Sequence, residues 1–200
     1  RVFPAEYLVG VTHQESGVFE FADLRDRRVG VVTRGARAWL AYLLRSRGWT
    51  EEQLREVVTL PSSEIAADAL CGAELDAIVT WGPHPALAVR LATEACSARP
   101  VSFDDRHGRR LVERFPFIEA RMVSVGLDRT PAIAIYAVLA TGVAADPDLV
   151  RRVADALADQ DAYLRDLLPG LPPVANGFDM SSALRTPLHV EASAAFSRTR

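Results

Sequence analysis

The amino-acid sequence predicts an α/β fold with a mixed, mainly parallel sheet flanked by helices. The main observation is that short, wholly apolar strands alternate with amphipathic helical stretches over residues 6–115. Such strands are typical of a parallel sheet that helices cover on both faces. The size of the chain agrees with this class, because 200 residues of which 49% are hydrophobic can bury a sizeable core.

The expected elements follow one another in a regular order up to about residue 128. We expect strands at residues 6–13, 28–33, 57–60, 76–80 and 100–103. We expect helices or helical turns at residues 21–26, 36–48, 61–72, 85–97 and 106–115. Ser62 or Ser63 can cap the third of these helices, because a serine hydroxyl accepts a hydrogen bond from the first turn, and Gly72 can end it.

The pattern changes after this point, which indicates a second structural region. A long apolar strand is expected at residues 131–141 and a long amphipathic helix at 145–168. A proline-rich link at 168–177 leads to a last helix near 189–198. The pattern therefore favours two lobes joined by the strands near 6–13 and 131–141.

Charge and composition exclude several classes of function. The formal net charge is -3 with acids and bases interspersed, so the chain lacks the basic surface of a nucleic-acid-binding protein. All 23 basic residues are arginines, which excludes a Schiff-base lysine and the lysine-dependent phosphate loop. No stretch approaches the roughly 18 apolar residues that a membrane-spanning helix needs.

The cysteines and histidines match no metal or redox motif. Cys71 and Cys96 lie in alanine-rich helical stretches, where we expect buried free thiols that do not identify a compartment. Residues 104–108 (DDRHG) are the best candidate metal site, but Asp104 and Asp105 fit better as caps of the following helix. We therefore expect no metal and no cofactor.

Three loops after strands carry unusual residues, at the carboxyl ends where open parallel sheets bind their ligands. Residues 33–37 (TRGAR) place the free N–H groups of a helix start beside Arg34 and Arg37, which suits a small anion. Residues 60–64 (LPSSE) and 80–85 (TWGPHP) follow the next two strands.

In the last of these loops, Trp81 can supply a flat aromatic face and His84 an imidazole. Structural roles remain open, since surface arginines are commonly solvated, Trp81 could equally pack between lobes and His84 could equally lie on the surface. The candidate ligand-binding residues are Thr33, Arg34, Gly35, Ala36, Arg37, Trp81, Gly82 and His84.

The order of several motifs adds a family resemblance. The stretches that carry it are FADLRDRRVGVVTRGAR (21–37), LLRSRGW (43–49), ALCGAELDAIVTWGPHPALAVRLA (69–92), FPFIEARMVSVG (115–126), PAIAIYAVLAT (131–141) and TPLHVEASAAF (186–196). They resemble the TAXI family of solute receptors, which serve TRAP-type membrane transporters. The positions that correspond to the family's motifs are Asp23-Leu24, Arg28-Val29, Gly35 to Ala38, Asp76-Ala77, Gly82 to Pro85, Leu188-His189 and Ala192.

The resemblance implies a two-lobed, periplasmic-binding-protein-like (type II) fold located outside the cytoplasm, either in a periplasm or tethered at the cell surface. Residues 1–14 would form a hinge strand and part of lobe 1, residues 15–128 lobe 2, and residues 129–200 the return hinge strand and helices packed on lobe 1. The match covers only the later part of a typical member. Because the chain starts at Arg1, in mid-strand by its pattern, we expect that upstream residues were processed off or are absent from this chain. The location that the resemblance implies needs a leader, which this chain does not contain.

Such receptors close a cleft on a small ligand, and a permease recognises the closed form. The implied function is capture of a small anionic or zwitterionic metabolite, an amino acid or a carboxylate, by a monomer that acts with a TRAP permease and catalyses nothing. Two departures concern the ligand. Ala36, Arg37 and Ala38 stand where the family has small hydroxyl residues, and residues 124–130 lack the family's tyrosine, so an aromatic wall is lost or Trp81 replaces it.

Two other classes of function stay open. One is a ligand-sensing input domain of a signalling protein with the same fold. The other is an enzyme acting on small acids, for which His84 is the only candidate base, although the chain contains neither a G-x-S-x-G nor an H-E-x-x-H motif.

Overall fold

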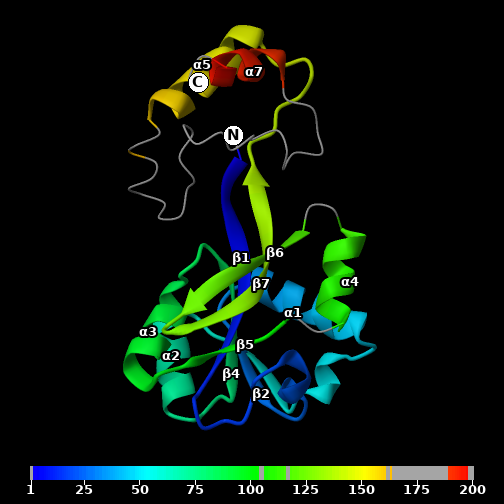
Figure 1. Ribbon diagram of the computed structural model, residues 1–200, viewed down its shortest axis with the longest axis vertical. Helices are drawn as coiled ribbons and strands as arrows, with labels where there is room; N and C mark the ends of the chain where they lie inside the picture. Colours follow the sequence, from blue (N-terminus) through cyan, green and yellow to red (C-terminus); the bar gives the residue numbers. More distant parts are fainter. Residues whose placement is uncertain (1, 104–105, 116–117, 161–162, 164–188, 198–200) are drawn as a thin grey trace. The chain divides into compact units, whose positions relative to one another are not determined.

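The computed structural model describes residues 2–103, 106–115, 118–160, 163 and 189–197. The chain divides into two compact units, one formed by Arg1–Ala5 with Tyr136–Arg200 and the other by Glu6–Ile135. We call these unit 1 and unit 2. Strands β1 (Val2–Thr12) and β7 (Asp128–Val138) both cross the division between the units (Figure 1). All eight candidate ligand-binding residues belong to unit 2.

The sheet is mixed, as the sequence predicts. Its strand order is β3-β2-β4-β1-β7-β6, and β5 also pairs with β1. Strands β2 (Arg28–Val31), β3 (Glu56–Thr59) and β4 (Ala77–Gly82) are parallel. Strand β1 runs antiparallel to β4 and β5 (Arg99–Val101), and β6 (Ile118–Val125) runs antiparallel to β7. The predicted α/β class with a mixed sheet flanked by helices is therefore confirmed. The expected parallel majority is not found among the described strands, because β1 and the β6–β7 hairpin add antiparallel pairs to the two parallel pairs of β2, β3 and β4.

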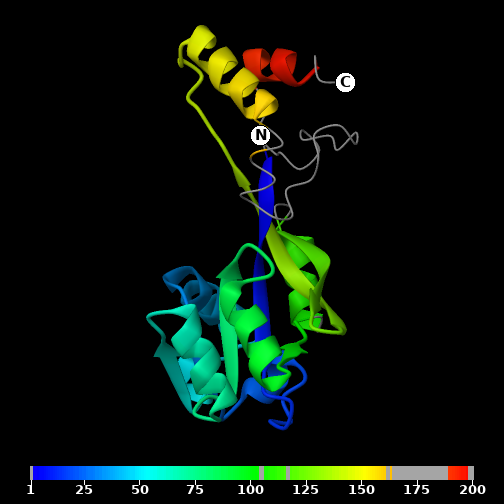
Figure 2. The same cartoon turned by 90° about the vertical axis from the view of Figure 1, so that its left-hand side faces the viewer.

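Helices of unit 2 cover both faces of this sheet. Helix α1 (Arg34–Ser46) packs on one face with α4 (Arg106–Arg114), and Leu40, Leu43 and Leu44 of α1 are fully buried there. Each such leucine contributes about 1.5–3 kcal/mol on burial. Helices α2 (Ser63–Cys71) and α3 (Leu87–Cys96) lie side by side and bury their alanines with Leu70 in a second cluster (Figure 2). Two 3-10 turns, Phe21–Leu24 and Glu51–Gln53, complete this unit's described elements.

Two strands differ from the predicted elements. Strand β4 continues through Trp81 and Gly82, which were expected in a loop, because Leu8 and Tyr7 of β1 pair with them. Strand β6 is not among the expected strands, although apolar and polar residues alternate from Ile118 to Met122. In the structure its middle residues Ala120, Arg121 and Met122 are all exposed.

In unit 1, helices α5 (Pro147–Asp159) and α7 (Val190–Ser197) pack against each other. The Arg151 guanidinium donates through Nε to Oε2 of Glu191 over 2.8 Å, and this hydrogen bond and charge raise the pKa of Arg151. The predicted helix near 189–198 is confirmed by α7. The predicted proline-rich link at 168–177 lies outside the described residues.

The expectation of two free thiols is wrong. Cys71 and Cys96 form a disulfide with their Cα atoms 5.5 Å apart, within the ordinary range for a disulfide. Each cysteine is the last residue of its helix, α2 or α3. Because these two helices follow the parallel strands β3 and β4, they run in the same direction and their final residues come together.

Candidate functional site

The three loops singled out by the sequence lie at one edge of the sheet. Strands β2, β3 and β4 are parallel, so their carboxyl ends, and the residues that follow them, share that edge. The first and third loops touch directly. A Cβ atom added at Gly35 would lie 3.1 Å from Cδ1 of Trp81, which shows how closely the indole approaches the start of α1.

Thr33 and Ala36 build the start of α1. Thr33 is the N-cap, and its Oγ1 accepts a hydrogen bond from the backbone N–H of Ala36 over 3.0 Å. The backbone N–H of Arg37 donates to the Thr33 carbonyl over 3.1 Å. The Ala36 side chain is fully buried, so Ala36 contributes to the surface of the helix start only through its backbone. Their assignment to ligand binding stays a prediction.

The two arginines of this loop have different environments. Arg37 forms a two-pronged ion pair with Glu51, with Nη2 2.6 Å from Oε2 and Nε 3.2 Å from Oε1, and its Nη1 donates to Thr59 over 3.1 Å. Arg34 is exposed and makes no hydrogen bond or ion pair with any residue that the structure describes. Arg34 is therefore the arginine that is available to an anion.

Trp81 belongs to a row of aromatic side chains along α1. Its ring stacks on Trp39 with centroids 5.2 Å apart and planes 23° apart. The row continues by edge contacts from Trp39 to Tyr42 and from Tyr42 to Phe115. Trp39 and Tyr42 are not among the residues predicted to bind a ligand, although their spacing of three places them on one helix face.

His84 is held by two other strands. Its Nε2 lies 2.8 Å from the carbonyl oxygen of Ser124 in β6, and its ring meets Tyr7 of β1 edge-on with centroids 5.8 Å apart. Its Nδ1 is buried and has no hydrogen-bond partner among the described residues. A general base needs a nitrogen that the substrate can reach, so this arrangement argues against His84 as a catalytic base. Gly82, with φ +155°, has a backbone conformation that favours glycine.

An ion pair lies at the opposite edge of the sheet, where β2 and β4 begin. Oδ2 of Asp76 accepts from the backbone N–H of Arg28 over 2.8 Å and from its Nε over 3.3 Å. Burial alone would raise the pKa of Asp76, but these hydrogen bonds together with the charges of Arg28 and Arg27 lower it. Two of the motif positions in the family resemblance, Arg28-Val29 and Asp76-Ala77, thus join β2 to β4.

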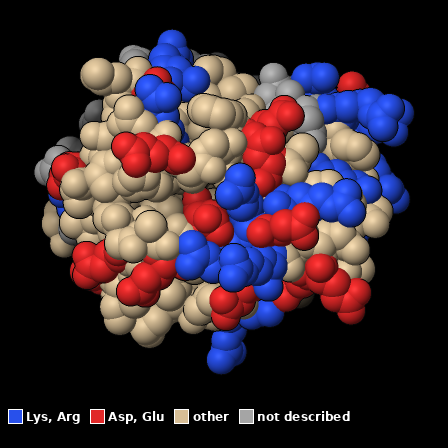
Figure 3. Space-filling model, turned by 90° about the horizontal axis from the view of Figure 1, so that it is seen from below, with Lys and Arg blue, Asp and Glu red and all other residues tan. Residues whose placement is uncertain are grey.

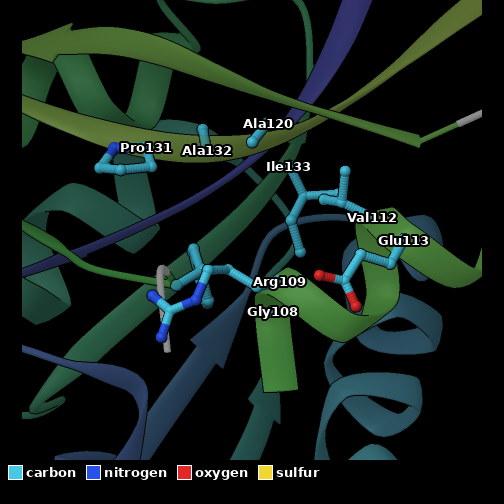
Figure 4. Close-up of a pocket in the computed structure, with 9 residues that line it drawn as sticks. Gly108, Arg109, Val112, Glu113, Ala120, Pro131, Ala132 and Ile133 are labelled. Atoms are coloured by element: carbon cyan, nitrogen blue, oxygen red, sulfur yellow. The ribbon is translucent and has the colours of Figure 1, made fainter. Parts of the chain in front are cut away.

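A pocket of about 200 Å³ lies elsewhere in unit 2. It is lined by α4, β6 and β7 with Phe103, and Glu113 and Arg109 stand at its side (Figure 4). None of the eight candidate ligand-binding residues lines it. The described part of the chain contains no group of three or more His, Cys, Asp or Glu side chains that could hold a metal ion; Asp104 and Asp105 lie outside it.

Charged residues intermix on the face of the molecule seen from below. Arginine side chains gather near its middle, and aspartates and glutamates border them (Figure 3). Among the described residues, no helix combines the length and the hydrophobicity needed to cross a bilayer.

Comparison with solved structures finds binding proteins at low identity. The substrate-binding protein of an amino acid ABC transporter is 14% identical, with 84% of this chain and 61% of that chain covered and a TM-score of 0.45. The periplasmic aliphatic sulphonate binding protein SsuA from Escherichia coli is 16% identical, with 99% and 66% covered and a TM-score of 0.47. The cysteine-binding protein from Campylobacter jejuni is 12% identical, with 84% and 55% covered and a TM-score of 0.45.

This chain thus spans less than two thirds of the length of each of these proteins. None of the three is described as a TRAP-type receptor, so the resemblance to the TAXI family is not confirmed at that level. No curated protein matches the chain. Residues 2–197 match the model of the NMT1-like family, and the chain therefore belongs to the NMT1-like family.

Proposed function

We propose that the chain is part of an extracytoplasmic solute-binding protein that captures a small anionic or zwitterionic metabolite for a membrane transporter and catalyses no reaction. The ligand is an amino acid, a carboxylate or a sulfonate. The order of motifs supports a TRAP-type permease as partner, whereas the amino acid binding protein named above serves an ABC transporter.

One observation supports an anionic or zwitterionic ligand. Arg34 has no ionic partner among the described residues and stands at the first position of α1, next to Gly35, which the Trp81 indole approaches closely. A helix start favours an anion by about 0.3–1 kcal/mol when exposed and up to ~2 kcal/mol when partly buried. A guanidinium adds a bidentate pair with a carboxylate or sulfonate.

The disulfide supports an extracytoplasmic location. Cys71 and Cys96 are bonded, and disulfides form and persist in oxidising compartments.

The two strands that cross between the units support a hinge. We propose that β1 and β7 act as the hinge of lobes formed by residues 15–128 and by residues 1–14 with 129–200, and that the ligand favours the closed form.

A thermal-denaturation screen with L-glutamate, L-arginine, L-cysteine and methanesulfonate tests this function. A true ligand stabilises the protein by about 2.7 kcal/mol at a hundredfold excess over its Kd. Replacing Arg34→Gln removes the charged pair and should weaken binding about tenfold to a hundredfold.

Arg55→Gln is the matched control, because Arg55 is also exposed but precedes β3 at the opposite edge of the sheet. It should leave the affinity unchanged. Equal affinity of the wild type and the Arg34→Gln variant for a probe that binds would exclude Arg34 as the anion partner, and no response to any probe would count against the ligand class.

A further inference from the structure

His84 joins the loop that follows β4 to two other strands of unit 2. Its Nε2 lies 2.8 Å from the Ser124 carbonyl oxygen on β6, and its ring contacts Tyr7 on β1. Tyr7 also pairs with Gly82 in the ladder between β1 and β4. The imidazole thus connects three segments that are far apart in the sequence.

The chemistry of these contacts assigns one tautomer. A carbonyl oxygen only accepts hydrogen bonds, so Nε2 must carry the proton and donate it to Ser124. In a neutral imidazole the other ring nitrogen, Nδ1, is then an acceptor; Nδ1 is buried and has no partner in the described part of the chain. The side chain therefore has a single directional bond, and that bond points to the β6–β7 hairpin.

Of the two strands reached by His84, β1 crosses the division between the units, and β6 pairs with β7, which also crosses it. Tyr7 lies in β1, which crosses from unit 1 into unit 2. Ser124 pairs with Arg129 of β7, the other crossing strand. On its other side, the segment that holds His84 includes Trp81, which packs against the start of α1.

We propose that His84 is a positioning residue that couples the candidate ligand loop, residues 80–85, to the crossing strands through its Nε2–H bond to Ser124. It acts on the ligand through the loop and the strands, not by touching the ligand. The description of residues 80–85 as a ligand loop rests on the proposed function, but the mechanical coupling does not.

Amide hydrogen exchange of the full chain tests the coupling without any ligand. In the His84→Ala variant, exchange should become about twofold to tenfold faster both at residues 80–84 and at residues 125–127, as expected for the loss of one hydrogen bond. His84→Gln should behave like the wild type, because its side-chain amide can place a donor near the position of Nε2. His84→Asn, whose amide reaches only the position of Nδ1, should behave like His84→Ala.

His107→Ala is the matched control. His107 makes a similar bond in the same unit, with Nδ1 3.0 Å from the Ser46 carbonyl oxygen, but among the described residues no hydrogen bond or ring contact joins its side chain to β1 or to the hairpin. This variant should leave both segments unchanged. The coupling is overturned if His84→Ala affects residues 80–84 alone, if His84→Gln matches His84→Ala, or if His107→Ala produces the same changes.

Binding of L-glutamate, measured by calorimetry, separates the two proposals. If the wild type binds it, His84→Ala should weaken binding and His84→Gln should restore it, and equal affinities of all variants would overturn the coupling to the ligand loop. Absence of binding by the wild type counts against L-glutamate as the ligand, while the exchange experiment still decides whether His84 couples the loop to the strands.

Discussion

Arg34 and Arg37 lie three positions apart in one helix start and have different physical roles. Arg37 points toward Glu51 and Thr59 and ties α1 to the turn and strand that follow it. This pair is partly exposed, so its net contribution to stability is about 0.2–1 kcal/mol. Arg34 precedes it by nearly one helical turn and keeps its guanidinium in solvent. The sequence indicates both arginines as candidates for anion binding but does not distinguish them, because Glu51, the ionic partner of Arg37, lies in a separate 3-10 turn.

The ion pair of Asp76 with Arg28 should make stability depend on acid pH. The folded-state pKa of Asp76 is lowered below its unfolded value near 3.9, so the stabilisation is fully present above about pH 4 and is lost as the pH falls through the folded pKa. Replacing Asp76→Asn should cost about 1–2 kcal/mol at pH 7, because a partly buried charged hydrogen bond is lost. Urea denaturation at pH 7 and below pH 4 measures the difference.

Asp68→Asn on α2 serves as the control, since Asp68 is exposed. It should change stability little at either pH. If the Asp76→Asn variant were less stable than the wild type by the same free energy of unfolding down to pH 2, the stabilisation would not come from the ionised carboxylate.

At the scale of elements, Gly30 sets how closely β2 packs against its neighbours. A Cβ atom at this position would lie 2.7 Å from Cδ1 of Leu75, 2.8 Å from Cδ1 of Leu60 and 3.2 Å from Cγ2 of Ile78. We predict that Gly30→Ala destabilises the fold by about 1–3 kcal/mol, because a methyl group is forced into a filled core. Gly142→Ala is the control, since its Cβ meets nothing within 4 Å. Equal denaturation midpoints of both variants would contradict the prediction.

Most element positions follow from the sequence because local signals and tertiary structure agree. Ser62 caps α2, its hydroxyl accepting from Ile65, and the helix ends before Gly72 as predicted. The apolar runs that predict β2 and β4 pair in parallel. The disulfide could not be predicted, because it depends on the alignment of α2 and α3, which is set by the sheet order.

The candidate site likewise has features that could be predicted from the sequence and features that could not. Placement of the three loops at one edge could be predicted, since it needs only the parallel direction of the strands. The environment of His84 could not, because its partners Tyr7 and Ser124 lie 77 and 40 residues away and belong to antiparallel strands.

The disulfide makes the stability of the whole molecule depend on whether its compartment is oxidising or reducing. It closes a segment with a sequence separation of 25 residues, for which chain entropy predicts about 3.5 kcal/mol of stabilisation. Protein made in an oxidising compartment should show no thiol that reacts with an alkylating reagent under denaturing conditions. Reduction should lower the free energy of unfolding of the wild type.

The control is the double variant Cys71→Ser with Cys96→Ser. It should be less stable than the oxidised wild type and insensitive to reductant. Two alkylated cysteines in oxidised protein, counted by mass spectrometry, would refute the bond and remove this support for an extracytoplasmic location.

The stack of Trp39 and Trp81 has an optical consequence. Two indoles with centroids 5.2 Å apart couple their electronic transitions and give a pair of circular dichroism bands of opposite sign. Trp39 belongs to α1, whereas Trp81 lies near the end of β4, within residues 80–85, the segment that also contains His84. Any displacement of that segment from α1 therefore changes the intensity of this band pair, so the protein contains a spectroscopic reporter that needs no added label.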